Sequence, residues 1–307
     1  MHILARRGPA GWLVILLLAV LAIVPGLRPL PVAAQVSVDC AAPATPAAAT
    51  PAAPAASPVA ASPVAFPQGG GEVTVFAAAS LTDAFGKIKS DLEAANPGLT
   101  ITYNFAGSQA LVTQLKEGAT ADVFASANKT QMTAATDNGS ISGTPATFVR
   151  NKLAIVVPID NPAGIAAPVD LGNEGLKLVV AQADVPVGKY ARESLCTMGR
   201  DTATYGEGFV DRVAGNIVSE EEDVRDVLAK VELGEADAGI VYLSDAASAP
   251  DQVKVVEIPA GVNVVASYPI ALVTGGTTDL ASAFIAYVLG PEGQATLKTF
   301  GFEPVTS

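Results

Sequence analysis

The sequence predicts an α/β fold with largely parallel sheets, because short apolar runs alternate with helical patterns along most of the chain. In the clearest unit, an apolar run at 73–79 precedes apolar side chains with helical spacing at Leu81, Phe85, Ile88 and Leu92. Further strands are predicted at 101–105, 122–125, 153–157, 176–181 and 239–242. Further helices are predicted around 111–115 and at 189–198, 221–233 and 279–289.

Two serines stand where a predicted strand runs into a predicted helix. Ser80 follows the run at 73–79, and Ser108 follows the strand at 101–105. The start of a helix offers unpaired N–H groups and the positive end of a dipole, so it binds an anion without a basic side chain. Serine is also the ordinary N-cap residue, which is the plainer interpretation of either one alone. Two such serines at the carboxyl ends of successive strands favour a ligand site.

The second half of the chain supplies further candidates of the same kind. Pro186 is suited to the start of a helix, so the N–H of Val187 is expected to point out of a helix N-terminus. The acidic segment 219–225 opens the next predicted helix, and its acids are typical of a solvated cap. Tyr242 stands at the carboxyl end of a strand, where a tyrosine is more often a rim or core residue than a ligand.

A faint internal repeat bears on the number of lobes. Residues 115–124 resemble residues 231–240: in both, a helix ends at a glycine and an Ala-Asp pair leads into an apolar strand. The repeat has two explanations, which are two similar lobes with a cleft between them, or the independent use of one turn.

The N-terminal 34 residues are predicted to be a secretory signal peptide. Arg6 and Arg7 give a positive start, residues 12–24 are apolar but short for a bilayer span, and residues 32–34 fit a cleavage site. The mature chain is therefore expected outside the cytoplasm. Residues 35–70, rich in Ala and Pro, are predicted to be a linker, and the folded part is expected at 71–307.

The two cysteines are too few for a disulfide framework. Cys40 lies just after the predicted cleavage site, so lipid attachment is one possibility, favoured by the spacer that follows it and disfavoured by the residues before it. A disulfide between Cys40 and Cys196 is another. The main expectation for Cys196 is a small buried apolar side chain on the helix at 189–198.

Charge and missing residue types exclude several classes of function. The formal net charge is −12 with no basic patch, which argues against nucleic-acid binding. The single histidine, His2, lies in the predicted signal peptide, so the mature chain lacks a Ser-His-Asp triad and a histidine-based zinc site. The single tryptophan, Trp12, lies there too, which makes a sugar-binding protein less favoured.

Several segments together resemble one family, the molybdate-binding proteins of ABC importers. The resemblance covers about residues 73–302 in order and rests on these segments: Phe76-Ala-Ala-Ala-Ser80-Leu, Phe105-Ala-Gly-Ser108, Ala121-Asp-Val-Phe-Ala-Ser-Ala127, Val185-Pro-Val-Gly-Lys-Tyr190-Ala, Glu222-Asp-Val-Arg225, Gly239-Ile-Val-Tyr242 and Tyr268-Pro-Ile-Ala-Leu. Gly107 and Val187 depart from the better-known members of this family.

The resemblance implies a two-lobed periplasmic binding protein of type II, with mainly parallel sheets flanked by helices and a ligand cleft between the lobes. Residues 71–151 and 265–307 would form the first lobe and residues 152–264 the second. The bound oxyanion, molybdate or tungstate, would be held by five residues: Ser80, Ser108, Val187, Val224 and Tyr242. Molybdenum would be bound only as this oxyanion, without a further cofactor. The partner would be a membrane permease, and a monomer is expected.

Two alternatives to this function remain at the level of sequence. One is a binding protein for another small anion such as sulfate, or for an organic solute such as an amino acid, whose carboxylate Arg192 or Arg225 would hold. The other, least favoured, is a serine hydrolase. Neither serine lies in a Gly-x-Ser-x-Gly motif, and the base would have to be Lys87 or Lys116, so no catalytic residue is assigned and the chain is not expected to be an enzyme.

Overall fold

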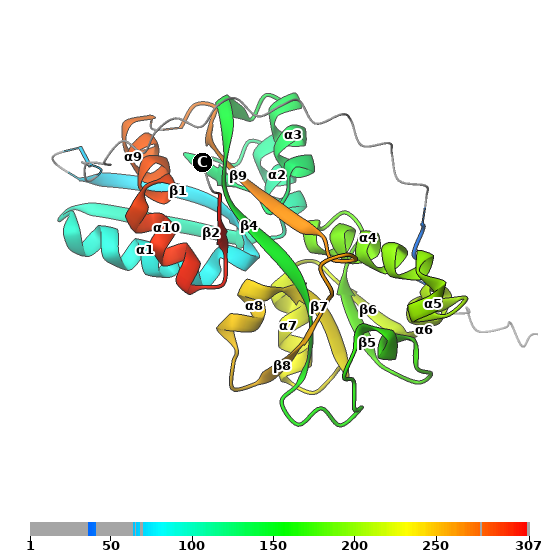
Figure 1. Ribbon diagram of the computed structural model, residues 1–307. Coiled ribbons are helices and arrows are strands. Elements are labelled where there is room, and N and C mark those ends of the chain that lie inside the picture. Colours follow the sequence, from blue (N-terminus) through cyan, green and yellow to red (C-terminus); the bar gives the residue numbers. More distant parts are fainter. Residues whose placement is uncertain (1–35, 41–63, 65, 68–69, 277, 306–307) are drawn as a thin grey trace, which may run out of the picture. The chain divides into compact units, whose positions relative to one another are not determined.

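The computed structural model describes residues 36–40, 64, 66–67, 70–276 and 278–305 (Figure 1). The predicted signal peptide lies outside these residues, as does most of the predicted linker. The strands are β1 Gly71–Ala78, β2 Leu99–Ala106, β3 Val123–Ala125, β4 Ile141–Pro158, β5 Leu178–Ala181, β6 Ile217–Glu221, β7 Ala238–Tyr242, β8 Val253–Glu257, β9 Val265–Val273 and β10 Glu303–Pro304. The α-helices are α1 Thr82–Ala95, α2 Ser108–Lys116, α3 Lys129–Asp137, α4 Pro186–Arg200, α5 Thr202–Tyr205, α6 Phe209–Asn216, α7 Val224–Glu232, α8 Leu243–Ser248, α9 Thr278–Leu289 and α10 Pro291–Thr299.

Two sheets share the long strand β4, and each sheet builds one lobe. In the first lobe the order is β2-β1-β3-β9-β4, and β4 pairs with β9 from Ile141 to Lys152. In the second lobe β4 continues from Leu153 beside β7 and β8, and the order runs on to β5 and β6. The pairs β1–β2, β1–β3, β5–β6 and β5–β7 are parallel, whereas β4 and β9 run antiparallel to their neighbours. The α/β, two-lobed fold class is thus confirmed.

Helices cover both faces of the first lobe's sheet, because its strands are apolar on both sides (Figure 1). In β1, Val73 and Val75 face the cluster that contains Phe85 of α1 and Phe284 of α9. Phe76 joins a second buried cluster with apolar residues of α2 and α3. Two of these helices, α1 and α2, follow β1 and β2 directly in the chain. They therefore start next to the carboxyl ends of these strands, where parallel α/β sheets bind their ligands.

The internal repeat forms the same turn in both lobes. Gly118 after α2 and Gly234 after α7 have φ of 93° and 69°, a left-handed conformation that suits glycine at the end of a helix. The carboxylate of Asp122 then accepts the N–H of Thr74 at 2.7 Å, and that of Asp237 accepts the N–H of Lys177 at 2.8 Å. Each aspartate thus ties the incoming strand to the edge of its neighbour.

Cys196 is buried on α4 as expected, but the expectation that it is unpaired was wrong, because it forms a disulfide with Cys40. Spacing in the sequence could not show this, since 156 positions separate the two cysteines. The described ends of the predicted linker also pack on the folded part: Phe66 is buried, and Val36 and Val38 contact the main core. Among the described residues, no helix is long and apolar enough to cross a membrane.

Candidate functional site

A small cavity lies at the carboxyl ends of β1, β2 and β7 and is lined by residues of both lobes. The lining residues include all five candidates: Ser80, Ser108, Val187, Val224 and Tyr242. The cavity has a volume of about 10 Å³, which is about the space that one water molecule needs. A larger groove of about 540 Å³ elsewhere in the first lobe contains none of the five residues.

Ser80 does not cap a helix, contrary to the plainer interpretation of its position. It lies in a 3-10 turn, Ala79–Leu81, that joins β1 to α1, and the N-cap position of α1 is Leu81. The side chain is buried, and its Oγ lies 2.9 Å from the hydroxyl of Tyr268 on β9. Tyr268, which is distant in the sequence, thus holds the Ser80 side chain at the cavity by a hydrogen bond.

Ser108 does not act as a cap either, because it is the first residue of α2 and the N-cap position is Gly107. Its Oγ accepts the backbone N–H of Ala127 at 3.0 Å. This bond occupies a lone pair and leaves the serine proton free to be donated. Gly107 is needed here, since a Cβ at this position would lie 2.6 Å from the carbonyl oxygen of Glu222 in the other lobe.

Two further helices start at the second lobe's side of the cavity. Val187 is the second residue of α4, which begins at Pro186 and has no side-chain cap. Val224 is the first residue of α7, whose N-cap Asp223 accepts the N–H groups of Arg225 and Asp226. The predicted capping role is therefore confirmed for Asp223 alone, because Glu220 and Glu221 lie in β6 and pair with Arg192 and Lys230. Asp223 is the one charged residue that lines the cavity, and its Oδ1 is already engaged by these two N–H groups.

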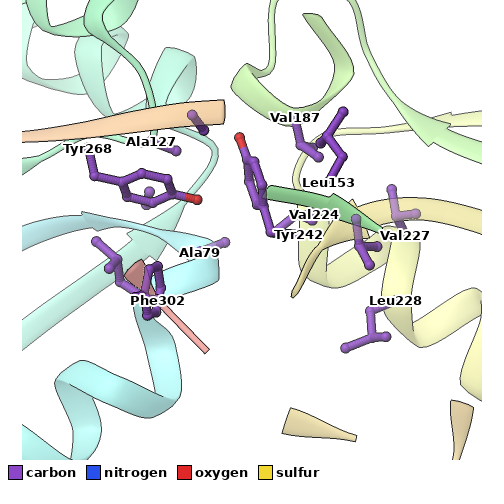
Figure 2. Close-up of a cluster of buried hydrophobic side chains, with 14 of the residues drawn as sticks. Ala79, Ala127, Leu153, Val187, Val224, Val227, Leu228, Tyr242, Tyr268 and Phe302 are labelled. Atoms are coloured by element: carbon purple, nitrogen blue, oxygen red, sulfur yellow. The ribbon is translucent and has the colours of Figure 1, made fainter. Parts of the chain in front are cut away.

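Tyr242 brings an unpartnered hydroxyl to the cavity. The side chain is 1% exposed, and among the described residues no group hydrogen-bonds its hydroxyl. Burial, with a smaller contribution from Tyr268, raises the pKa of Tyr242 well above its ordinary value, so the phenol keeps its proton. Its ring packs edge-on against Tyr268 at 5.7 Å between centroids (Figure 2). A buried donor without a partner is costly, which indicates that a ligand is its partner.

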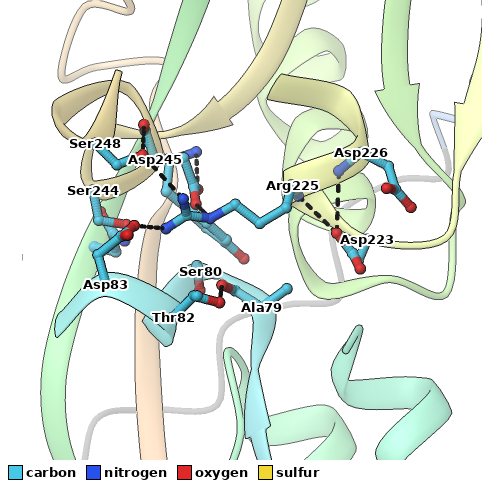
Figure 3. A network of polar contacts seen from close by, with 12 residues as sticks. Ala79, Ser80, Thr82, Asp83, Asp223, Arg225, Asp226, Ser244, Asp245 and Ser248 are labelled. Atoms are coloured by element: carbon cyan, nitrogen blue, oxygen red, sulfur yellow. Dashed lines mark hydrogen bonds and ion pairs between the residues drawn. The ribbon is translucent and has the colours of Figure 1, made fainter. Parts of the chain in front are cut away.

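Arg225 joins the two lobes beside the cavity (Figure 3). Its Nη2 lies 2.6 Å from a carboxylate oxygen of Asp83 on α1, and its Nε lies 3.0 Å from Asp245 on α8. Asp245 is fully buried, and its other oxygen accepts the N–H of Tyr242 at 3.2 Å. Neither Asp83 nor Asp245 was predicted from the sequence as part of the site, although an aspartate three residues after Tyr242 is a recognisable helix-start signal.

Other polar contacts also cross between the lobes. The side-chain amide of Gln109 donates to the carbonyl of Glu222 at 2.8 Å, and Lys189 Nζ donates to Thr130 Oγ1 at 3.0 Å. The lobes are therefore closed over the cavity in this conformation. Arg192, the other cation considered for an organic carboxylate, binds Glu220 and the carbonyl of Ala181 instead.

The cavity offers mainly hydrogen-bond donors. No group of three or more His, Cys, Asp or Glu side chains within the described ranges is arranged to hold a metal ion. The donors are the serine and tyrosine hydroxyls together with the first N–H groups of α2, α4 and α7. Such a set suits an anion that only accepts hydrogen bonds.

Comparisons with known proteins find relatives of one functional class. The molybdate-binding protein ModA of Mycobacterium tuberculosis is 41% identical over 236 residues, which cover 76% of this chain and 85% of that protein. A substrate-binding domain provisionally assigned to a molybdenum ABC transporter of Clostridium difficile is 30% identical, with a TM-score of 0.58 over 76% of this chain and 99% of that one. The periplasmic molybdate-binding protein of Azotobacter vinelandii, 18% identical, shares the fold with a TM-score of 0.66 over 76% of this chain and all of that one (100%).

The family model for bacterial extracellular solute-binding proteins matches residues 73–303, which is most of the chain. The chain therefore belongs to the bacterial extracellular solute-binding proteins, in the group that includes these molybdate-binding relatives.

Proposed function

We propose that this protein captures molybdate or tungstate outside the cytoplasm and delivers it to the permease of an ABC transporter. The observation that carries the proposal is the cavity of neutral donors, with the unpartnered hydroxyl of Tyr242 among them. The 41% identity to a molybdate-binding protein supports the choice of ligand. We assign the oxyanion contacts to the hydroxyls of Ser80, Ser108 and Tyr242 and to the backbone N–H groups of Val187 and Val224.

The chemistry of the ligand matches these donors. Molybdate and tungstate carry no proton at neutral pH, so every oxygen accepts hydrogen bonds. Fixed donors in a site closed to water stabilise such an anion without a basic side chain. Sulfate has the same character, so the size of the closed cavity would separate it from the larger molybdate.

The competing functions find less support at this site. An amino acid would need a free cation for its carboxylate, whereas Arg192 and Arg225 are engaged by Glu220, Asp83 and Asp245. A serine hydrolase would need a base at its nucleophile, whereas Ser80 contacts Tyr268 and Ser108 contacts a backbone N–H. We therefore assign no enzymatic activity to the chain.

The disulfide bears on how the protein is retained outside the cytoplasm. The sulfur of Cys40 is bonded to Cys196, so it is not free to carry a lipid in this form of the chain. Disulfides persist in oxidising compartments, which fits the predicted export. We propose a monomeric binding protein that closes on the anion, so that the closed surface is what the permease recognises.

The ligand assignment predicts a specific loss in Tyr242→Phe. Removing the hydroxyl deletes one donor to a charged ligand in a closed site, so we expect molybdate affinity to fall about 10- to 150-fold. The free energy of unfolding without ligand should hardly change, because the hydroxyl has no hydrogen-bond partner among the residues that the structure describes. Calorimetric titration with molybdate, tungstate, sulfate and phosphate measures this, and Tyr287→Phe on α9 is the matched control. Equal binding by Tyr242→Phe and the parent would contradict the site.

A second prediction separates backbone from side-chain contacts at the start of α7. Val224→Pro removes the N–H but suits the backbone, because Val224 is the first helical residue and Asp223 before it is extended, with φ −152° and ψ 177°. We expect about 10- to 150-fold weaker molybdate binding in Val224→Pro. Val224→Ala, which keeps the N–H, should bind within about threefold of the parent. The reverse order of affinities would show that α7 does not hold the ligand through its N–H groups.

A further inference from the structure

Tyr268 lies directly behind Ser80 and is not among the residues that line the cavity. Its side chain is fully buried, with the ring packed edge-on against Phe148, Tyr242 and Phe302. The hydroxyl lies 2.9 Å from Ser80 Oγ. The 2.9 Å bond to Ser80 thus links this hydroxyl directly to a residue of the cavity lining.

Asn151 stands behind Tyr268 in turn and has a fixed orientation. Its side-chain Oδ1 accepts the N–H of Lys152 at 3.0 Å, and its Nδ2 donates to Ser244 Oγ at 2.8 Å. These two bonds determine which end of the amide faces the tyrosine. The Nδ2 group therefore lies toward the Tyr268 hydroxyl, at a longer 3.5 Å.

This arrangement gives the chain of hydrogen bonds a direction. Burial raises the pKa of Tyr268, so its hydroxyl keeps its single proton. Asn151 can only donate toward that hydroxyl, because its carbonyl oxygen is turned to Lys152. The tyrosine proton can then be given to Ser80 Oγ, whose 2.9 Å bond is shorter than the 3.5 Å bond to Asn151. Ser80, having accepted a bond, turns its own proton toward the cavity.

Two other acceptors in the cavity lining already accept protein N–H groups. Ser108 Oγ accepts the N–H of Ala127, and the carboxylate of Asp223 caps α7 through its Oδ1. At Ser80, a ligand that carries a proton, such as hydrogen phosphate, would therefore meet a donor and not a free acceptor. An unpaired O–H group buried in a closed site is unfavourable by the loss of its hydrogen bond to water.

We infer that Tyr268 is a positioning residue: it holds Ser80 as a hydrogen-bond donor and so makes the site select fully deprotonated oxyanions over protonated ones. This inference rests on the proposed oxyanion site and adds the source of its selectivity. Without the tyrosine hydroxyl, Ser80 Oγ is free to rotate and to accept a proton from the ligand.

A double-mutant cycle tests whether Tyr268 acts through Ser80. Titrations with molybdate are run on the parent, Tyr268→Phe, Ser80→Ala and the double variant. We expect Tyr268→Phe to weaken binding about three- to tenfold and Ser80→Ala about 10- to 150-fold. The double variant should bind within about twofold of Ser80→Ala, because the tyrosine has nothing left to position. In a Ser108→Ala background, Tyr268→Phe should keep its full effect.

Selectivity gives an independent measurement. The ratio of the dissociation constants for inorganic phosphate and molybdate should fall about threefold or more in Tyr268→Phe. Tyr103→Phe is the matched control, because it removes a hydroxyl that donates to the carbonyl of Phe85 at 2.9 Å and that lies outside the cavity lining. It should leave both affinities unchanged. If Tyr268→Phe does not fold, Asn151→Asp replaces the donor with an acceptor and should show the same coupling to Ser80.

The outcomes separate this inference from the proposed ligand. Equal losses from Tyr268→Phe with and without Ser80, or an unchanged selectivity ratio, overturn the positioning role while the molybdate site stands. If the parent binds sulfate but not molybdate, the ligand assignment fails and the same cycle is run with sulfate. If the parent binds no oxyanion, both conclusions are wrong.

Discussion

Arg225→Met is expected to lower the free energy of unfolding by about 2 kcal/mol at pH 8.5, because Asp245 loses the cation that favours its ionised form and has to keep its proton. Asp245 is 0% exposed, and Arg225 Nε at 3.0 Å is the positive group that faces it. The remaining contact of this carboxylate is the N–H of Tyr242. Urea unfolding of the ligand-free protein, followed by circular dichroism, measures the loss.

The loss in the free energy of unfolding should increase with pH, because Asp245 is buried. Burial raises the pKa of Asp245 to about 7, while Arg225 lowers it. Since this folded-state pKa is above the unfolded value of about 4, the contribution of Asp245 to stability is fully present below pH 4 and is lost as the pH rises toward 7. Without Arg225 the pKa of Asp245 rises further. The variant should therefore have nearly the same free energy of unfolding as the parent at pH 5 and a lower one at pH 8.5.

Two control variants locate the cause. Adding Asp245→Asn to Arg225→Met removes the buried carboxyl group and should restore most of the lost stability. Asp83→Asn deletes only the partly exposed contact across the lobes and should cost at most about 1 kcal/mol. An Arg225→Met loss of equal size at pH 5 and pH 8.5 would show that packing, rather than charge, is responsible.

Removal of the disulfide is expected to lower the free energy of unfolding by about 2–5 kcal/mol, because the Cys40–Cys196 bond closes a loop of 156 positions in the unfolded chain. The double variant Cys40→Ala and Cys196→Ala, in the mature chain from residue 35, is compared with the parent by urea unfolding. Molybdate affinity should stay within about twofold, since Cys196 lies roughly 13 Å along α4 from Val187.

Mass spectrometry of non-reduced peptides gives the corresponding direct result. The peptides that contain Cys40 and Cys196 should be found joined, and the parent treated with a reductant should unfold like the double variant. A lipid mass on Cys40, or equal unfolding curves with and without the bond, would contradict this prediction.

The position of the site could be predicted from local patterns, because strand-to-helix junctions are encoded by neighbouring residues. Ser80, Ser108 and Val187 stand at such junctions, and the structure brings them to one cavity. Boundaries were less accurate: the helix predicted at 189–198 begins at Pro186. The strand predicted at 153–157 is the end of β4, whose first residues pair with β9 in the other lobe.

The partners of the site residues could not be predicted, because they come from distant parts of the chain. Ser80 and Tyr268 are 188 positions apart, and Arg225 and Asp83 are 142 apart. A capping role was the plainer interpretation of both serines, since it needs only neighbours. It was wrong because the Ser80 hydroxyl is hydrogen-bonded to Tyr268 and the Ser108 hydroxyl to the N–H of Ala127 instead.

Strand β4 has a consequence for how the molecule unfolds. One continuous strand supplies backbone hydrogen bonds to both sheets, to β9 along its first part and to β7 and β8 along its last. Melting either sheet therefore frays a strand on which the other depends, so the lobes are thermodynamically one cooperative unit although each has its own sheet. Anion capture between the lobes then raises the stability of the whole chain, and not only of the residues around the ligand.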